Sequence, residues 1–310
     1  MKTRKLVLII ADVLLLAVCV IQLILSARDT TKYFTFKEEP DSIQIVTPTE
    51  KIELYKEGDD WFIGDKKYPA SISVVDSYID SISNIRALDK VGSISSGNWA
   101  EKYELTEGKK TVVTAKLGGK VLRTLELGKT AVSASQSYCC IDGGKDIYLI
   151  SGSVNDIFDT SVAATRTTIV LNLNAADITQ VSVTDCETDK TWSVSRMGSG
   201  DDIAWNASGD GSENGIELDT EAAANWLNSF ASLSTRDWYA DDAVLEGSKA
   251  VSAKITCAFK TISVEFFALP KENEKDLQQY YGVCSETPYL FKVNESSVKQ
   301  YLKTLSELAK

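Results

Sequence analysis

The feature that most constrains this chain is an apolar run near its N-terminal end. Residues 6–25 read LVLIIADVLLLAVCVIQLIL, and Asp12 and Gln22 are the polar interruptions. At about 1.5 Å per residue, a helix of this length spans the roughly 30 Å hydrocarbon core of a bilayer. The sequence therefore predicts a transmembrane anchor over residues 6–25.

Charge next to this run predicts its orientation. The pentapeptide MKTRK at residues 1–5 carries three basic side chains, whereas the residues after the run are mixed in charge. The positive-inside rule then places residues 1–5 in the cytoplasm and the rest of the chain outside it. A cleaved signal peptide fits less well, because its apolar core is usually about 7–15 residues long and ends in an Ala-x-Ala site. Lipidation of Cys19 in the sequence LAVC is a further alternative, although Val18 is bulky for that site.

The two polar residues of the run suggest a contact inside the membrane. Asp12 and Gln22 are ten residues apart, which at 100° per residue leaves them about 80° apart around a helix. They lie on one side, where they could hydrogen-bond to a neighbouring transmembrane helix. The expected partner is a polytopic membrane protein, such as an ABC transporter permease. A lone tolerated acid in a passive tether is the alternative.

Composition excludes several function classes. The chain has 33 Lys and Arg against 44 Asp and Glu, for a net charge of −11, so nucleic acid is a poor partner. Histidine is absent, which removes Ser-His-Asp and Cys-His catalysis and His-ligated zinc. We predict no cofactor, no metal and no enzymatic activity.

Cysteine spacing shows no metal motif. Cys139 and Cys140 are adjacent, so in a strand their side chains point to opposite faces and one of them is expected in the core. The remaining cysteines outside the run are Cys186, Cys257 and Cys284. An odd total leaves at least one unpaired, and a disulfide between Cys257 and Cys284 is one possibility among several.

After a polar linker over 26–41, hydrophobic periodicity predicts alternating strands and one main helix. Strands are expected at 42–46, 51–56, 60–63, 110–117, 120–127, 137–141 and 146–150. Glycine pairs at 118–119 and 143–144 mark hairpin turns. The main helix carries a stripe of Val75, Tyr78, Ile79 and Ile82 at i, i+3, i+4 and i+7, with Ser73 and Asp76 as a capping box. A short helix near 153–161 ends this half.

The second half repeats this order. Strands are expected at 177–183, 190–195, 203–206, 249–256 and 261–267, with a terminal helix carrying Val298, Tyr301, Leu302 and Leu305. The helix after Asp219 has the same stripe as the first helix, with Ala223, Trp226, Leu227 and Phe230. We therefore expect an α+β fold in which the transmembrane helix precedes two tandem repeats of an antiparallel sheet with packed helices, over 42–165 and 166–310.

Several short segments resemble the bacterial domain of unknown function 4340 family. They are Trp61-Phe-Ile, Tyr103-Glu-Leu105, Leu125-Glu-Leu-Gly128, Tyr148-Leu-Ile150, Arg166-Thr-Thr-Ile169 and Asp177-Ile-Thr-Gln-Val181. The resemblance covers 42–183 well and the remainder more weakly. Glu104 stands at the glycine of the family's Tyr-Gly-Leu step. The resemblance implies no catalytic residue. It implies an accessory role, since proteins of this family are often encoded beside permease and ATPase genes of gliding-type ABC transporters.

Acidic residues give two weak signals of chemistry. Residues 206–217 match part of a calcium-loop pattern, with Asn206, Ser208, Asp210, Gly211, Ser212, Asn214 and Glu217 at ligand or turn positions. Acid pairs at 59–60, 201–202 and 241–242 could serve as general acid and base. A solvated hairpin loop and ordinary turns explain these residues better, because Asp favours turn geometry.

Aromatic residues supply the remaining site candidates. Trp61, Trp205 and Trp226 fall on apolar faces and are expected in the core. Trp99 and Trp238 follow the two main helices at similar distances and are the candidate ligand or partner contacts. The expected function is a membrane-anchored, extracytoplasmic accessory or assembly protein of an ABC-type transporter or cell-envelope complex. The alternatives are a binding module for an envelope polymer or small ligand, and a carboxylate-based envelope hydrolase.

Overall fold

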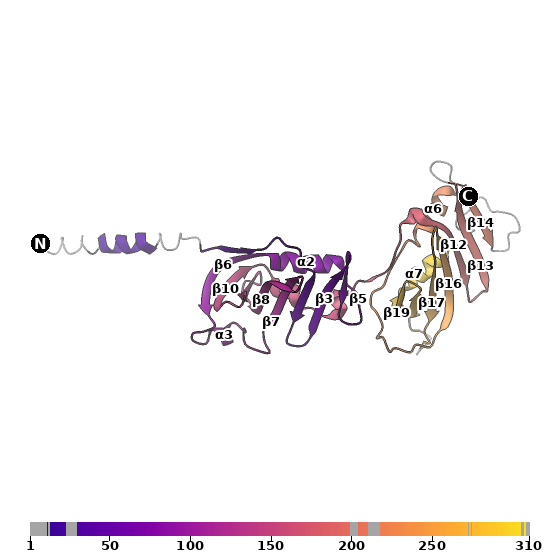
Figure 1. Cartoon of the computed structure of the whole chain (residues 1–310). Helices are drawn as coiled ribbons and strands as arrows, with labels where there is room; N and C mark the ends of the chain where they lie inside the picture. The colour runs from indigo at the N-terminus through magenta and orange to yellow at the C-terminus, as the bar shows by residue number, and fades with distance from the viewer. Residues whose placement is uncertain are drawn as a thin grey trace. The chain divides into compact units, whose positions relative to one another are not determined.

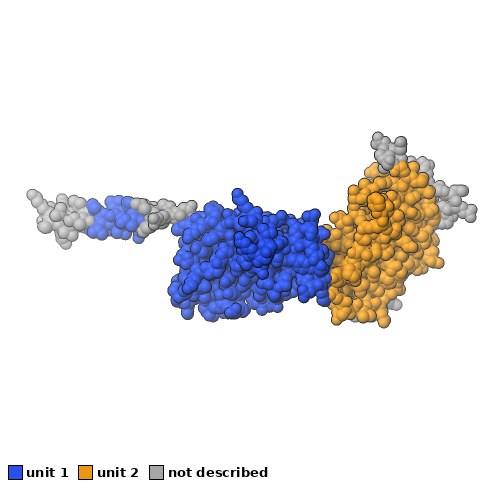
Figure 2. Space-filling view, in the orientation of Figure 1, with its two compact units in different colours: residues 1–166 blue, residues 167–310 orange. Residues whose placement is uncertain are grey.

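The computed structural model describes residues 11, 13–22, 30–198, 204–209, 218–271, 273, 275–304 and 307. Two compact units divide the chain, Met1–Arg166 (unit 1) and Thr167–Lys310 (unit 2) (Figure 2). Residues 13–22 are helical. Over the described residues, we find no helix that has both the length and the apolar character needed to cross a bilayer. Much of the predicted anchor, namely residues 6–10, 12 and 23–25, lies outside the described part.

Unit 1 is mostly β. Its elements are β1 (Lys32–Thr35), β2 (Ser42–Val46), β3 (Lys51–Glu57), β4 (Asp60–Ile63), β5 (Tyr68–Pro69), α2 (Ile72–Ser83), β6 (Asn84–Ser93), α3 (Trp99–Lys102), β7 (Thr111–Leu117), β8 (Lys120–Thr130), β9 (Gln136–Ile141), β10 (Asp146–Ser151), α4 (Val154–Phe158) and α5 (Val162–Thr165). Within the described residues, ten strands form one antiparallel sheet in the order β1-β6-β10-β9-β8-β7-β2-β3-β4-β5 (Figure 1).

The core of unit 1 lies between this sheet and α2. Alternate residues of β2, Ile43 and Ile45, are fully buried, as the period of two in a strand requires. On α2, Val75, Tyr78 and Ile82 are buried and Ile79 packs partly buried against the same cluster. The Tyr78 hydroxyl donates to Thr160 Oγ1 at 2.8 Å and lies 3.0 Å from Thr165 Oγ1. These two hydrogen bonds tie the helix to the segment around α4 and α5.

Unit 2 is also mostly β. Its elements are β11 (Ile169–Asn172), a 3-10 turn η1 (Ala175–Asp177), β12 (Ile178–Asp185), β13 (Lys190–Met197), β14 (Ala204–Gly209), α6 (Thr220–Asn228), β15 (Ser232–Ser234), β16 (Ser248–Cys257), β17 (Thr261–Ala268), β18 (Tyr280–Cys284), β19 (Thr287–Val293) and α7 (Glu295–Tyr301). Seven strands of the described residues form a sheet in the order β14-β13-β12-β16-β17-β18-β19, and β11 pairs with β15.

The strand order of unit 2 matches that of unit 1. Read from the other edge, β19-β18-β17-β16-β12-β13-β14 follows the same succession as β10-β9-β8-β7-β2-β3-β4. Next to this run, β6 joins β10 in unit 1, and the chain after β15 contacts β19 through a bridge between Trp238 and Phe291. β1 pairs with β6 as β11 pairs with β15. Each main helix precedes the corresponding outer strand.

Several local expectations need correction. The predicted linker over 26–41 contains β1, which pairs with β6, and β6 itself was not expected. The capping box at Ser73 is wrong, because α2 begins at Ile72 with Ser71 as its N-cap, and Ser71 makes no side-chain capping bond. The described helices are short and few compared with the strands. The fold is therefore mostly β, whereas the sequence predicted α+β. On α6, Asp219 does cap the helix, accepting from Ala222 N at 2.8 Å.

The cysteines are all free. Cys139 faces the main core of unit 1 and Cys140 faces a smaller cluster, so both are buried, on opposite faces. The possible Cys257–Cys284 disulfide is wrong. Cys257 is on β16 and Cys284 on β18, and β17 lies between them. Two strand spacings come to about 9.5 Å, beyond the roughly 7 Å that a disulfide allows between Cα atoms.

Candidate functional site

Trp99 begins the short helix α3 in the loop between β6 and β7. Its ring stacks on Tyr103 with centroids 5.8 Å apart, and Lys102 Nζ lies 4.4 Å from its centroid. Partly buried, it packs on a small cluster of Tyr103, Leu105, Cys140 and Ile147. A side chain at Gly92 would meet the Trp99 ring at 3.1 Å, so this glycine makes room for it. Trp99 therefore covers a local core and presents only part of its ring to solvent.

Trp238 follows β15 in the corresponding loop of unit 2. Its indole Nε1 donates to the Thr167 carbonyl at 2.8 Å. The ring meets Phe291 edge to face, with centroids 6.1 Å apart, and Phe291 is fully buried in the core of unit 2. Trp238 is thus held on both its polar and its apolar side. These contacts point to a role in positioning its loop.

Of the two candidate contacts within the apolar run, the structure describes only Gln22. Asp12 lies outside the described residues, and Gln22 is exposed on the helical segment. Their shared contact with a membrane partner stays a prediction.

A hollow beside Trp238 was not anticipated from the sequence. Its volume is about 580 Å³, within the range of small-molecule sites. Most of its lining residues have polar side chains, and they come from the loop after β15, the approach to β18, and the end of β19 with the start of α7. The lining residues are Arg236, Tyr239, Leu277, Gln278, Gln279, Tyr280, Lys292, Val293, Asn294, Glu295 and Ser296.

The loop on one side of this hollow is fixed by Thr235. The buried Thr235 hydroxyl lies 2.6 Å from the Asp237 carbonyl and 2.9 Å from the Lys292 carbonyl, and accepts from Asp237 N at 3.1 Å. Lys292 Nζ also pairs with the Asp237 carboxylate at 2.6 Å. This hydrogen bond is the main reason that the pKa of Lys292 is raised, so the lysine stays charged. The loop is therefore clamped to β19.

The charges and hydroxyls of the hollow favour acceptor-rich ligands. Arg236 makes no hydrogen bond or ion pair within the described residues. Burial is the main cause that raises the pKa of both Tyr239 and Tyr280, so both phenols remain hydrogen-bond donors at neutral pH. Glu295 is engaged by Lys299 at 2.8 Å. The sequence signal that could have found this hollow is Arg236, a cation directly before the Asp-Trp pair in an acidic chain.

Other candidates are placed as follows. Of the calcium-loop residues, Asn206 and Ser208 are described on β14, and 210–217 lie outside the described part. Asp59 and Asp60 are at the β3–β4 turn, Asp201 and Asp202 are not described, and 241–242 form a turn. Among described residues, no group of three or more His, Cys, Asp or Glu could hold a metal ion.

The core tryptophans fall close to expectation. Trp61 is 5% exposed and Trp226 2%, both in the cores, whereas Trp205 is partly buried against its core. Arg166, the arginine of the family resemblance, lies at the end of unit 1 with its guanidinium carbon 4.3 Å from the Tyr68 ring centroid. Its backbone bridges to Ala70. The residue closes the sheet edge at β5.

Comparison with known proteins assigns the chain to a protein family. The model of a domain of unknown function, DUF4340, matches residues 28–250. This match covers most of the chain, which therefore belongs to the DUF4340 family. No curated protein and no solved structure matches the chain at a significant level.

Proposed function

We propose that this chain is a membrane-anchored, extracytoplasmic accessory or assembly protein of an ABC-type transporter or cell-envelope complex, acting without catalysis. The observation that carries the proposal is the apolar run 6–25, followed closely by the first strand of a folded unit at Lys32. Residues 1–5 would be cytoplasmic and both units extracytoplasmic. The family resemblance supports a partner of the permease type.

The proposed partner contact lies within the membrane. Asp12 and Gln22 would hydrogen-bond to a helix of a polytopic permease, where such bonds are worth about 0.6–2 kcal/mol. The test is recovery of partners from detergent extracts by the full chain and by a variant with Asp12→Leu and Gln22→Leu. A matched control replaces Leu14 and Leu23 with Ile, which leaves the polar pair intact. Selective loss of the permease from the double Leu variant supports the proposal, and equal recovery contradicts an intramembrane contact.

Topology can be tested separately. Reporter fusions after residue 5 and after residue 310 should report cytoplasmic and extracytoplasmic locations respectively. A cytoplasmic C-terminal reporter would overturn the proposed localisation.

A second candidate is a binding module for an envelope polymer or small ligand. The specific observation in its favour is the hollow beside Trp238, lined by Arg236, which has no hydrogen bond or ion pair with the described residues. Arg236→Gln should weaken retention on an acidic envelope polysaccharide, and Arg86→Gln on β6 of unit 1 is the control. Trp238 is less suitable for this test than the sequence implied, because it packs into the core.

A further inference from the structure

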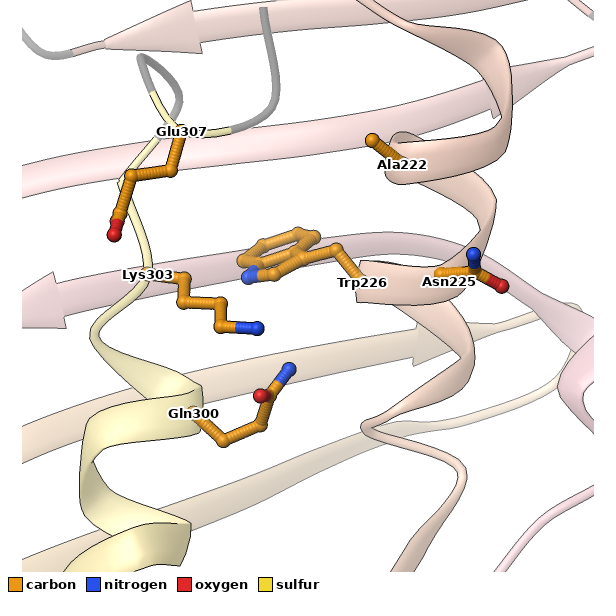
Figure 3. Close-up of a pocket in the computed structure, with 6 residues that line it drawn as sticks. All are labelled: Ala222, Asn225, Trp226, Gln300, Lys303 and Glu307. Carbon is orange, nitrogen blue, oxygen red and sulfur yellow. The ribbon is translucent and has the colours of Figure 1, made fainter.

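A second hollow of unit 2 lies between α6 and the chain that follows α7 (Figure 3). Its volume is about 380 Å³, suited to a molecule the size of one sugar or one amino acid. Its lining residues are Ala222, Asn225, Trp226, Gln300, Lys303 and Glu307.

Trp226 brings an unsatisfied donor to this hollow. The residue is 2% exposed, and its ring meets Phe230 edge to face with centroids 4.7 Å apart. Its indole Nε1 is buried without a hydrogen-bond partner in the described part of the chain. Leaving such a group unpaired costs about 1–3 kcal/mol. Figure 3 shows this nitrogen on the side of the ring that faces Lys303.

The corresponding residue of unit 1 has its partners. Tyr78 occupies the same place in the stripe of α2 that Trp226 occupies in α6. There, Thr160 and Thr165 of the segment around α4 and α5 bond to the tyrosine hydroxyl. The chain after α7 supplies no such acceptor from the described residues, and a hollow stands beside Trp226 instead. An acceptor brought by a ligand would complete the arrangement.

The neighbouring groups indicate what that acceptor is. Lys303 is exposed, and its ammonium makes no hydrogen bond or ion pair with any residue that the structure describes. Lys303 and Trp226 line the same hollow, and Figure 3 draws the ammonium on the side of the ring that carries the indole nitrogen. Gln300 Nε2 donates to Ser229 Oγ at 3.0 Å, which holds this side chain against α6. Two donors, one of them cationic, therefore face the same space.

Glu307 limits the charge of the ligand. Its Oε2 accepts from Thr304 N at 2.7 Å and lies 3.1 Å from Thr304 Oγ1, so the carboxylate is held at the rim. One ammonium and one carboxylate leave the rim with no net charge. A monoanion is favoured over a dianion such as phosphate, because the Glu307 charge repels the second negative charge.

We propose that this hollow binds a small organic monocarboxylate, with its carboxylate accepting from the Trp226 indole N–H and the Lys303 ammonium. The site is separate from the membrane contact proposed above, so either can fail without the other.

The test uses the full chain in detergent, labelled with 5-fluorotryptophan and observed by ¹⁹F NMR. The chain has six tryptophans, and Trp226→Phe assigns the Trp226 signal by its loss. The probes are D-glucuronate and N-acetylglycine, each compared with its neutral analogue, D-glucose and N-acetylglycinamide. We expect both carboxylates to shift the Trp226 signal and the neutral analogues to leave it unchanged.

Substitutions then test the two donors. Lys303→Gln should weaken carboxylate binding about tenfold, the value of a charge-assisted hydrogen bond. Lys299→Gln on α7 is the matched control, because Lys299 is engaged by Glu295. Trp226→Phe, read by calorimetry, should weaken binding similarly. Trp192→Phe should not, although the Trp192 nitrogen is also buried and unpaired among the described residues, because Trp192 does not line this hollow.

Three results would overturn the proposal. They are no shift with either carboxylate, equal shifts with the neutral analogues, and unchanged affinity in Lys303→Gln. If Trp226→Phe fails to fold, the Lys303→Gln result decides alone.

Discussion

The loop after the outer strand is built differently in the two units. In unit 1, the chain after β6 folds into α3 and its own small cluster, in which Trp99 stacks on Tyr103 and Tyr103 meets Tyr138 at a tilt of 32°. In unit 2, the loop between β15 and β16 has no helix in the described residues and is bonded directly to β19 through Thr235 and Trp238. The first arrangement fills the space at the sheet edge, and the second leaves the hollow beside Arg236. One strand order thus supports a closed loop in one unit and an open one in the other.

The largest expected difference between the units is in thiol reactivity. Burial is the main cause that raises the pKa of Cys140, to about 11, and it raises the pKa of Cys139 further. At neutral pH, a pKa of about 11 leaves about 100-fold less thiolate than an ordinary cysteine has. Cys186 and Cys257 of unit 2 are only partly buried. We expect a thiol reagent to label these two first, in a Cys19→Ser background, as read by peptide mass spectrometry.

The same burial predicts a pH dependence of stability. Below the unfolded pKa, near 9, the Cys140 thiol is neutral in both states and its contribution is fully present. As the pH rises from about 9 toward 11, the unfolded thiol ionises while the folded one stays neutral, so stability falls. Cys140→Ala should flatten the loss over this window in urea unfolding curves. Early labelling of Cys140 at neutral pH would mean that the closed loop of unit 1 opens.

The two loop tryptophans should differ in their effect on stability. Trp238→Ala loses the contact with the buried Phe291 and the bond to the Thr167 carbonyl, so the free energy of unfolding should fall by about 3 kcal/mol. Trp99→Ala removes contacts with a smaller cluster and should cost about 1–2 kcal/mol. Urea unfolding of the full chain in detergent measures both. If Trp99→Ala lowered the free energy of unfolding more than Trp238→Ala, the conclusion that Trp238 packs against the larger core would be wrong.

The Thr235 clamp can be removed with little change of shape. Thr235→Val leaves the Asp237 N–H and the Lys292 carbonyl without the hydroxyl, and should lower the free energy of unfolding by about 1–2 kcal/mol. Thr191→Val is the control, because its hydroxyl bonds to Thr184 on an exposed face. We expect faster amide exchange at residues 235–239 in the Thr235 variant. Unchanged exchange there would show that the loop is held without the hydroxyl.

The smallest effect concerns a residue under backbone strain. Glu104 adopts φ +60°, a left-handed conformation that glycine takes without cost, in the turn that ends α3. Glu104→Gly should raise the free energy of unfolding by about 0.5–1 kcal/mol, after the added freedom of the unfolded chain is counted. Asp189 in unit 2 has φ +55°, and Asp189→Gly should gain less, because Asp tolerates this region better. If Glu104→Gly lowered the free energy of unfolding instead, the conclusion that Glu104 is strained would be wrong.

Local patterns predicted much of each unit. The period of two located β2, β7 and β8, and the helical stripe located α2 and α6, because burial of one face imposes these periods. The periodicity did not reveal β6 or β1. In β6 the burial alternates only over Asn84 to Ala87 and the rest is partly exposed, so the apolar signal is weak. β1 is a four-residue edge strand with little buried side-chain surface, and its pairing depends on hydrogen bonds that leave no sequence pattern.

The sites were less predictable, because they depend on residues far apart in the sequence. Trp99 and Trp238 were identified as equivalent, but the cluster under Trp99 includes Ile147 of β10, and Trp238 meets Phe291 of β19. These residues from other strands decide that both rings are partly buried. The hollow at Trp226 exists because the described chain after α7 supplies no hydrogen-bond acceptor for the indole N–H. Spacing along the chain carries no information on such a missing acceptor. The missing acceptor becomes visible only when Trp226 is compared with Tyr78 in the two known folds.

The position of β1 sets how far the protein can reach. Only residues 26–31 separate the apolar run from Lys32, and a chain of that length spans at most about 20 Å. If the run is the proposed anchor, unit 1 cannot diffuse away from the bilayer surface and searches in two dimensions. A partner in the same membrane then meets it within this thin layer, so the two encounter each other more often than two proteins free in solution would. Even a contact too weak to form between free proteins would be populated under these conditions.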